Sequence, residues 1–413
     1  MTRILHTADW HIGHTLRGYG REYEHISVFD QLIQIVVDQQ VDVLVIAGDI
    51  FDSQNPSGEA QQLFYRTLSR LRAARSKMKI VIIAGNHDSG SRLEAPNALL
   101  ASLDMHVIGS VRRVHNRAIA ERHLISVRDF SNVVQLNILA VSHLTAGCLP
   151  NLSRLQDESG SLVVEKVREL YADLFRQLEA ELDGHPLIVT GHLHVIGGEL
   201  SDSSERRILA GGEHAVPHSV FPEQACYVAL GHLHKPQRVG ADHIRYNGSL
   251  FPLSASEHQY SHSVTLVTIE GGVASYEQIP LLRPVPFLRL PTKGTMPAVD
   301  LPSQLEALHL PPDLPEEQRP FVQVHLQREN LSVGFREELD RLAEPFPVRM
   351  LEPSIAAFTD SPEVLGAPDE SFRTVSDHQP EELFRMAFRE MHNKDPLPPH
   401  LAVFHSVITG VEV

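Results

Sequence analysis

The feature that most constrains this chain is a set of apolar runs, each ending in a small residue followed by polar side chains that can bind metal. The runs are ILHTADWH, VLVIAGD, VIIAGNHD, LIVTGHLH and YVALGHLH. Short, continuously apolar runs are typical of strands buried on both faces, as in a parallel sheet. Because the carboxyl ends of parallel strands open on one crevice, the pattern predicts that these polar groups converge there.

The order of the elements predicts an α/β fold. Helical patterning across 22–40 and 57–75 separates RILHT, VDVLVIA and KIVIIA, which indicates βαβαβ. A second set of predicted elements follows, with strands at 133–142, 186–190 and 226–230 and a helix across 162–182. The segments HIRYNGSL, HSVTLVTIEGG and VASYEQIPL then alternate with turn residues and predict antiparallel strands.

The length of 413 residues and a cluster of prolines after about residue 281 predict more than one domain. We expect a large domain at 1–282, a small βαβ domain at 283–360 and a polar tail at 361–413. Within the tail, residues 380–392 begin with Pro and two Glu and carry apolar residues at helical spacing, which predicts a short amphipathic helix.

Composition narrows the class of protein. A formal net charge of −16 argues against binding nucleic acid through the overall field, so any such contact must be local. Cys148 and Cys226 are too few for a disulfide framework and are read as reduced thiols. No apolar run approaches the ~20 residues that span a bilayer, and the N-terminus lacks the pattern of a secretory signal. These features predict a cytosolic protein that does not enter a membrane.

The chemistry of the strand ends predicts a metal centre. Mixed Asp oxygens and His nitrogens suit Mn²⁺, Fe or Zn²⁺ better than Ca²⁺. Each piece alone is weak, because an Asp after a strand is often a helix cap, and the chain has 25 His. Five pieces at equivalent positions are more specific. The strand-end glycines are expected to let the backbone turn sharply; they are Gly48, Gly85, Gly191 and Gly231.

The motifs D-x-H, G-D, G-N-H-D, G-H and G-H-x-H, in this order, resemble the signature of the calcineurin-like metallophosphoesterases. The longer blocks ILHTADWHIGHTLRGYGREYEH, VLVIAGDIFDSQNPS, IAGNHDSGSRL and YVALGHLHKPQ, with IRYNGSLFPLSASE, resemble SbcD-type nuclease subunits and their archaeal and eukaryotic counterparts in double-strand-break repair. These blocks cover most of residues 3–257. The resemblance implies a four-layer β-sandwich flanked by helices, with a small α+β capping domain and a C-terminal tail helix.

The resemblance also implies a two-metal site. One metal would be held by Asp9, His11, Asp49 and His234, and the other by Asp49, Asn86, His192 and His232. Asp49 is then the bridge between the ions. His87 would face the phosphate as a catalytic residue, stabilising charge or protonating the leaving group. Asp88 would orient His87, the alternative being a helix cap or a loop hydrogen bond.

Other polar residues near the motifs have alternative interpretations. His6 is expected in the core or behind the ligands, and His14 at the surface. His194, the second histidine of its GHLH segment, is expected to be incidental or to lie behind the ligands. Candidate contacts to a DNA backbone are Arg17, Arg21, Arg92, Lys235 and Arg238. For each of these cations the alternative is a solvated surface charge.

By resemblance, the expected function is that of a metal-dependent DNA nuclease in repair, recombination and replication. It would combine double-strand exonuclease with single-strand or hairpin endonuclease activity, using two Mn²⁺ ions, with Mg²⁺, Fe or Zn²⁺ as alternatives. The implied partners are DNA and an SbcC-type coiled-coil ATPase, with a homodimer inside a heterotetramer in the bacterial cytosol or nucleoid. One competing hypothesis is a phosphodiesterase or phosphatase acting on small nucleotides or phosphoproteins. The other is a metal-free scaffold of the same fold.

Overall fold

The computed structural model describes residues 1–114, 117–149, 160–201, 215–327 and 334–355, and single positions at 388, 394, 400 and 401. The chain divides into two units, Met1–Ala357 and Phe358–Val413. The helix predicted at 380–392 lies outside the described ranges. None of the helices in the described residues combines the length and apolar character that a bilayer crossing demands.

Two six-stranded sheets form the large domain. The first has the order β16 (Val273–Pro280), β15 (Ser263–Glu270), β1 (Thr2–Thr7), β4 (Val43–Ala47), β5 (Lys79–Ile83) and β6 (Met105–Ile108). From β1 to β6 the strands pair in parallel, and β15 and β16 are antiparallel additions at one edge. The βαβαβ order is therefore confirmed, and so are the antiparallel strands predicted for HSVTLVTIEGG and VASYEQIPL. The strand in HIRYNGSL instead has a parallel neighbour on one side and an antiparallel neighbour on the other.

The second sheet has the order β13 (Gln237–Val239), β14 (Ala241–Tyr246), β12 (Ala225–Gly231), β11 (Leu187–His192), β10 (Val134–Leu139) and β9 (Leu124–Arg128). Its four inner strands pair in parallel, whereas β9 and β13 are antiparallel edges. The five motif-bearing strands thus belong to two sheets. Reading them as strands of one sheet is wrong, because continuous apolar runs show that a strand is buried on both faces but not which sheet it joins.

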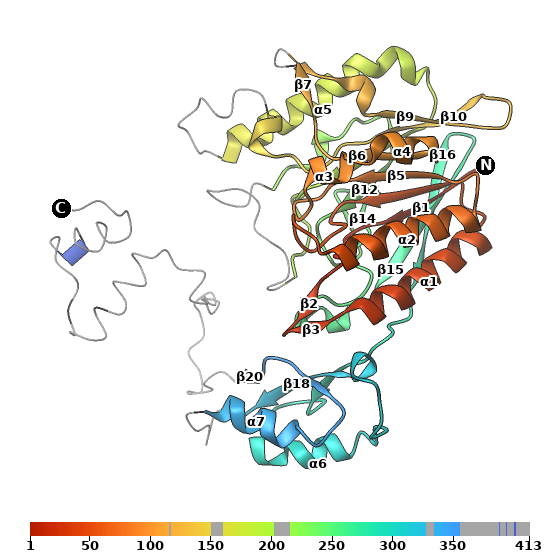
Figure 1. Cartoon of the computed structure of the whole chain (residues 1–413). Coiled ribbons are helices and arrows are strands. Elements are labelled where there is room, and N and C mark those ends of the chain that lie inside the picture. Colours follow the sequence, from red (N-terminus) through yellow and green to blue (C-terminus); the bar gives the residue numbers. More distant parts are fainter. Residues whose placement is uncertain are drawn as a thin grey trace. The chain divides into compact units, whose positions relative to one another are not determined.

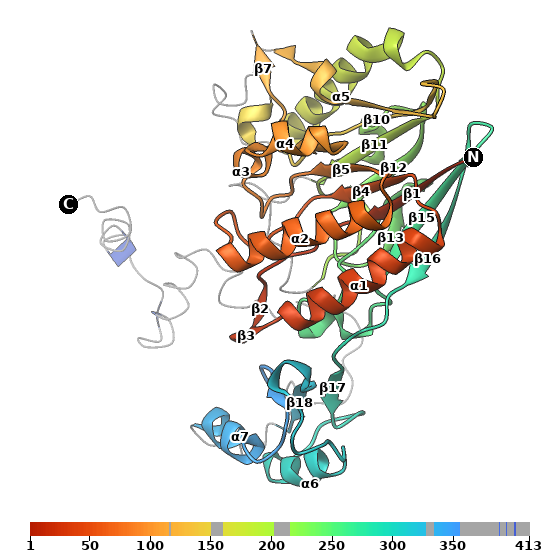
Figure 2. The same cartoon turned by 45° about the vertical axis from the view of Figure 1, so that its right-hand side comes forward.

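The layers follow from which faces are apolar. Side chains such as Ile4, Val45 and Ile138 come from both sheets and form one core between them. On the outer face of the first sheet lie α1 (Glu22–Asp38) and α2 (Gly58–Ala74), and α5 (Gly160–Leu182) covers the second (Figures 1 and 2). The result is the helix, sheet, sheet, helix sandwich that the resemblance implied.

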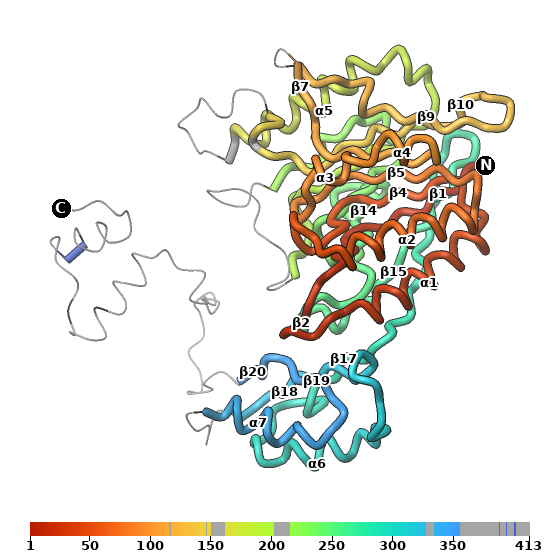
Figure 3. The backbone as a smooth tube through the Cα atoms, in the orientation of Figure 1, coloured from red at the N-terminus to blue at the C-terminus, as the bar shows by residue number. Residues whose placement is uncertain are grey.

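Shorter elements complete the large domain. They are the hairpin β2 (Thr15–Leu16) and β3 (Tyr19–Gly20), the hairpin β7 (Arg113–Val114) and β8 (Arg117–Ala118), and the helices α3 (Gly90–Glu94) and α4 (Asn97–Ser102). The tube in Figure 3 shows that β1, β4 and β5 run side by side, so the loops that follow them start at one edge of the sheet.

A smaller sheet with its own apolar core follows the proline cluster. Its elements are β17 (Phe287–Leu290), β18 (Phe321–Leu326), β19 (Arg349–Met350), β20 (Ser354–Ile355), α6 (Leu301–Glu306) and α7 (Phe335–Ala343). β18 and β19 pair in parallel and are joined through α7, as expected for a βαβ connection. The domain limits at 282 and 360 remain predictions.

Candidate metal centre

The ends of four strands bring two groups of possible metal ligands together. One group is Asp9, His11 and His234, and the other is Asp49, His192 and His232; within each, the ligand atoms lie within 4.8 Å of one another. Asp9 and His11 follow β1 and Asp49 follows β4, whereas His192 ends β11 and His232 and His234 follow β12. The structure therefore brings together, from both sheets, the residues that the sequence picked out.

In the first group, several ligand-type atoms are buried and lack hydrogen-bond partners among the described residues. Two of them are Oδ2 of Asp9 and Nε2 of His11, residues that are 0% and 2% exposed. The other carboxylate oxygen of Asp9 accepts a hydrogen bond from the His232 amide at 2.8 Å. A buried polar atom without a partner is costly, and a cation at this position would satisfy both atoms, so this donor set fits a metal.

In the second group, imidazoles and an amide converge on one point. Nδ1 of His192 donates to the Ala47 carbonyl at 2.9 Å, which turns Nε2 toward Asp49 Oδ2 at 3.2 Å. Oδ1 of Asn86 lies 2.9 Å from His192 Nε2 and 3.2 Å from His232 Nδ1. Asn86 therefore lies beside the second group, where the resemblance placed it as a ligand.

Asp49 connects the two groups. Its Oδ2 lies 3.6 Å from His11 Nε2 and 3.2 Å from His192 Nε2, so one oxygen faces a histidine of each group. Its Oδ1 accepts a hydrogen bond from the His87 amide at 2.8 Å, which fixes the carboxylate plane. Asp49 therefore lies between the two groups of possible ligands.

The backbone at the ligands is strained. Positive φ angles occur at Asp9 (52°), His11 (46°), Asp49 (49°) and His232 (105°). Left-handed backbone at residues other than glycine is uncommon and costs about 1–3 kcal/mol when the region is sparsely populated, and such residues cluster at functional sites. The strained backbone at the strand ends therefore directs these side chains toward one another at a cost in local conformational energy.

Two of the strand-end glycines act differently from what the sequence suggested. Gly48 has φ of +92° and does turn the chain, as expected. Gly191 and Gly231 lie inside β11 and β12, and a Cβ on Gly231 would lie 2.0 Å from the Ala47 carbonyl oxygen. A Cβ on Gly85 would lie 2.1 Å from Asp49 Oδ1. These glycines allow a close approach between chain segments, and the turning role predicted for Gly191 and Gly231, which lie within strands, is wrong.

The electrostatics of the centre also favour a cation. Burial alone would raise the pKa of Asp49, but His192 and then His11 outweigh it and hold that pKa well below its usual range. Burial alone would lower the pKa of His192, but Asp49 outweighs it and raises the pKa to about 9. Burial raises the pKa of Asp9 to about 6 despite the nearby histidines. A proton is thus held on His192, at a point where the ligands favour positive charge.

The predicted catalytic residue His87 lies at the edge of this centre. Its ring is 4.7 Å from the His11 ring, and its Nδ1 donates to the Asp52 carbonyl at 2.9 Å. Asp52 also places a carboxylate oxygen 3.4 Å from His11 Nδ1. Asp52 was not predicted from the sequence, although it lies three residues after Asp49 in the same loop.

Asp88 makes the loop hydrogen bonds that were the alternative to orienting His87. Its carboxylate accepts the amides of Ile50, Phe51 and Gly85 at 3.0, 2.9 and 2.8 Å. It thereby fastens the loop after β5 to the loop after β4. Burial, followed by the charge of Asp49, raises its pKa to about 6.

Arg21 is buried and paired within the protein, which argues against the DNA contact predicted for it. Its side chain is 0% exposed and forms an ion pair with Glu24. Its guanidinium donates to the Pro252 carbonyl at 2.9 Å and lies over the rings of Phe251 and Phe321, at 4.7 and 4.9 Å. A planar guanidinium stacks well on aromatic faces, so Arg21 joins the start of α1 to the small domain.

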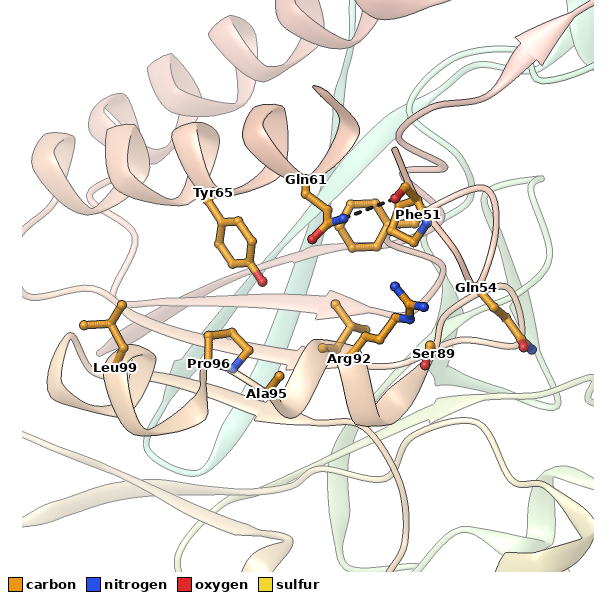
Figure 4. A pocket seen from close by; sticks show the side chains of 11 residues that line it. Phe51, Gln54, Gln61, Tyr65, Ser89, Arg92, Ala95, Pro96 and Leu99 are labelled. Atoms are coloured by element: carbon orange, nitrogen blue, oxygen red, sulfur yellow. Dashed lines mark hydrogen bonds between the residues drawn. The ribbon is translucent and has the colours of Figure 1, made fainter. Parts of the chain in front are cut away.

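The other candidate cations are accessible. Arg17 donates to the carbonyls of Met350 and Leu351 at 3.3 and 3.0 Å, so it also contacts the small domain. Arg92 extends from α3 into an open pocket of about 530 Å³ that α2 borders (Figure 4). Lys235 and Arg238 form exposed ion pairs with Glu199 and Asp242. The DNA contacts of these four cations stay predictions.

Three further histidines are now placed. His6 is buried, with Nδ1 3.0 Å from the Tyr227 hydroxyl, as expected of a core residue. His14 is half-buried instead of solvent-facing, and burial lowers its pKa to about 3. His143, missed from the sequence, has its ring 6.1 Å from that of His192 and donates from Nδ1 to the His192 carbonyl at 3.2 Å. It follows the end of β10, so the rule applied to the other strands would have found it.

Several known proteins are similar to this chain in sequence. The family described as calcineurin-like phosphoesterase matches residues 2–236. A protein of Rhodobacter capsulatus, named as the SbcD component of nuclease SbcCD, is 43% identical over 388 residues, 94% of this chain and 94% of that protein. Proteins of the same name from Bacillus subtilis and Escherichia coli K12 are 37% and 30% identical, covering 70% and 95% of this chain and 71% and 92% of their own lengths.

The family match spans more than half of the chain, and two of the relatives are similar over nearly their full lengths. The resemblance stated from the motifs is thus confirmed. The chain belongs to the calcineurin-like phosphoesterases and, within them, to the SbcD components of SbcCD nucleases.

Proposed function

We propose that this chain is the nuclease component of an SbcCD-type complex and hydrolyses DNA phosphodiester bonds with two bound divalent metal ions. The observation that carries the proposal is the position of Asp49 Oδ2, which faces His11 of one ligand group and His192 of the other. Bridged two-metal centres are a recurrent solution for phosphodiester hydrolysis. The relatives' name, which assigns them to the nuclease SbcCD, supports the substrate class.

Mn²⁺ is the metal we propose. The two ligand groups offer Asp oxygens and His nitrogens, with no cysteine among their members. This donor set suits a borderline first-row metal, and it leaves Mg²⁺, Fe and Zn²⁺ as alternatives for the metal analysis to separate. Bound metal ions would polarise the phosphoryl oxygens and lower the pKa of a water that attacks phosphorus.

The residues of the chain would then have separate roles. Asp49 holds the two ligand groups at one carboxylate, and Asp9 ties the turn after β12 to the end of β1 through the His232 amide. Nδ1 of His87 is already a donor to Asp52, so Nε2 is the nitrogen that would face substrate. His87 in its neutral form can accept a proton there, and in its protonated form it can donate one to the leaving oxygen or stabilise its charge.

DNA would be bound by local cations rather than by the overall field, because the net charge is −16. Arg17, Arg92, Lys235 and Arg238 are the candidate contacts. Both double-strand exonuclease and single-strand or hairpin endonuclease activity belong to the proposal. So do a homodimer, an SbcC-type ATPase partner docked through residues 380–392, and a role in DNA repair, recombination and replication in the bacterial cytosol.

One assay tests the proposed function. The purified chain is incubated with Mn²⁺ and either linear duplex DNA or bis-p-nitrophenyl phosphate. Degradation of DNA that responds to ATP once the coiled-coil partner is added is the expected result. Turnover of the small diester with intact DNA would favour the phosphodiesterase alternative, and absence of both bound metal and turnover would favour the scaffold. Deletion of residues 361–413 tests the docking segment, and the partner is expected no longer to co-purify.

A further inference from the structure

A buried carboxylate, that of Glu257, lies next to a predicted metal ligand. Glu257 belongs to the short 3₁₀ helix η5 (Ala255–Gln259), and its side chain is 0% exposed. Its Oε1 lies 2.9 Å from His234 Nδ1. An ionised carboxylate only accepts hydrogen bonds, so Nδ1 of His234 carries the hydrogen. The tautomer is thereby set, and in the neutral ring the lone pair that can bind a metal is on Nε2.

The carboxylate is held in one orientation by its own partners. Oε2 of Glu257 accepts the Leu253 amide at 2.9 Å and the Ser249 hydroxyl at 3.4 Å. The Ser249 amide in turn donates to the His234 carbonyl at 3.1 Å. The segment from 249 to 257 therefore supports both the backbone and the ring of His234, whose ring lies 5.1 Å from that of His11.

The support given to His234 differs from that given to His192 and His11. His192 donates from Nδ1 to a neutral carbonyl, that of Ala47. His11 has Asp52 at 3.4 Å, but that carboxylate is 36% exposed, so water screens it. A buried anion at hydrogen-bond distance makes an imidazole more basic and a stronger ligand, and changing such a partner typically costs about 10- to 100-fold in metal affinity.

We infer that Glu257 is a positioning residue that sets the metal affinity of the group Asp9, His11 and His234, separately from the group around His192. The inference rests on the proposed function, because it requires that the two groups bind metal. The two sites then differ in metal affinity. The affinity of the site that contains His234 depends on the charge of Glu257 and on the length of its side chain.

The test is Mn²⁺ titration of the full chain by calorimetry, comparing wild type with Glu257→Gln. Gln keeps the size of the side chain and removes the charge. We expect the variant to keep one site at wild-type affinity and to bind at the other about 10- to 100-fold more weakly. Excess Mn²⁺ should restore DNA cleavage. Glu94→Gln is the matched control, because Glu94 is also buried but accepts the Gly109 amide and pairs with Arg112.

A second variant guards against misfolding. A Gln amide nitrogen facing the Leu253 amide would lose a hydrogen bond, so circular dichroism checks the fold of the metal-free variant. If Glu257→Gln does not fold, Glu257→Asp carries the test, because it keeps the charge but withdraws it from Nδ1, and the same selective weakening is expected. Two wild-type affinities in the folded variant would overturn the inference alone. A wild-type chain that binds no Mn²⁺ would overturn the proposed function as well.

Discussion

The tetrapeptide GHLH occurs twice, at 191–194 and 231–234, and the two copies are folded differently. In the first copy β11 continues through His192, and His194 lies outside both ligand groups. In the second copy β12 ends at Gly231, His232 has φ of 105°, and His232 and His234 join different groups. The same four-residue sequence therefore supplies one candidate ligand in the first copy and two in the second.

The difference lies in what surrounds each copy. The carbonyl of His194 accepts the Val216 amide at 2.9 Å, which ties the chain after β11 to another segment. The amide of His232 is held by Asp9, and the ring of His234 by Glu257. Contacts distant in sequence thus determine which histidines of each copy join a candidate ligand group, and this difference predicts how variants of each copy behave.

The largest effect is expected for Asp49, which lies between the two ligand groups to which the copies contribute. Asp49→Ala should lose both metal ions and reduce DNA cleavage to background, because Asp49 Oδ2 faces His192 of the first copy and His11, the neighbour of His234. Metal analysis after gel filtration measures the ions. Asp104→Ala is the control, since Asp104 also has positive φ (56°) but pairs with Lys79. Retention of two ions in Asp49→Ala would remove the proposed bridge.

The second prediction distinguishes the cleavage step from metal binding, to which both copies contribute. His87→Ala should lower the cleavage rate by about 10²- to 10⁴-fold, the usual contribution of a proton-transfer residue, while both ions stay bound. The half-buried His106, paired with Asp104, provides the control variant His106→Ala. Rate constants at saturating Mn²⁺ and metal content are the measurements. If the ions are lost along with activity, His87 acts on metal binding instead.

A smaller effect concerns His6, a buried histidine outside both copies. Burial lowers its pKa from 6.5 to about 3, so the folded state resists a proton that the unfolded state accepts. Stability is unaffected well above pH 6.5 and should fall as the pH drops from 6.5 toward 3, by up to about 1.4 kcal/mol per pH unit from this group. Denaturant unfolding of metal-free protein measures this slope. His6→Asn should flatten it, and an unchanged slope would contradict the assignment.

Much of this centre could be predicted from the sequence. The ligands follow strands whose apolar runs are unmistakable, and each motif carries residues of the right chemistry. The sheet to which each strand belongs could not be read, because burial on both faces looks the same in either sheet. Glu257 was missed because it follows no strand end, and Arg21 was misplaced because the aromatic rings that bury it, Phe251 and Phe321, come from distant segments.

The most direct test of the account compares the second histidine of each copy. Mn²⁺ bound per chain is measured by calorimetry for wild type, His234→Ala and His194→Ala. We predict two ions for wild type, one for His234→Ala, and two for His194→Ala, with cleavage in the last within about a factor of two of wild type. Loss of an ion in His194→Ala, or two tightly bound ions in His234→Ala, would contradict two unequal contributions to one metal centre.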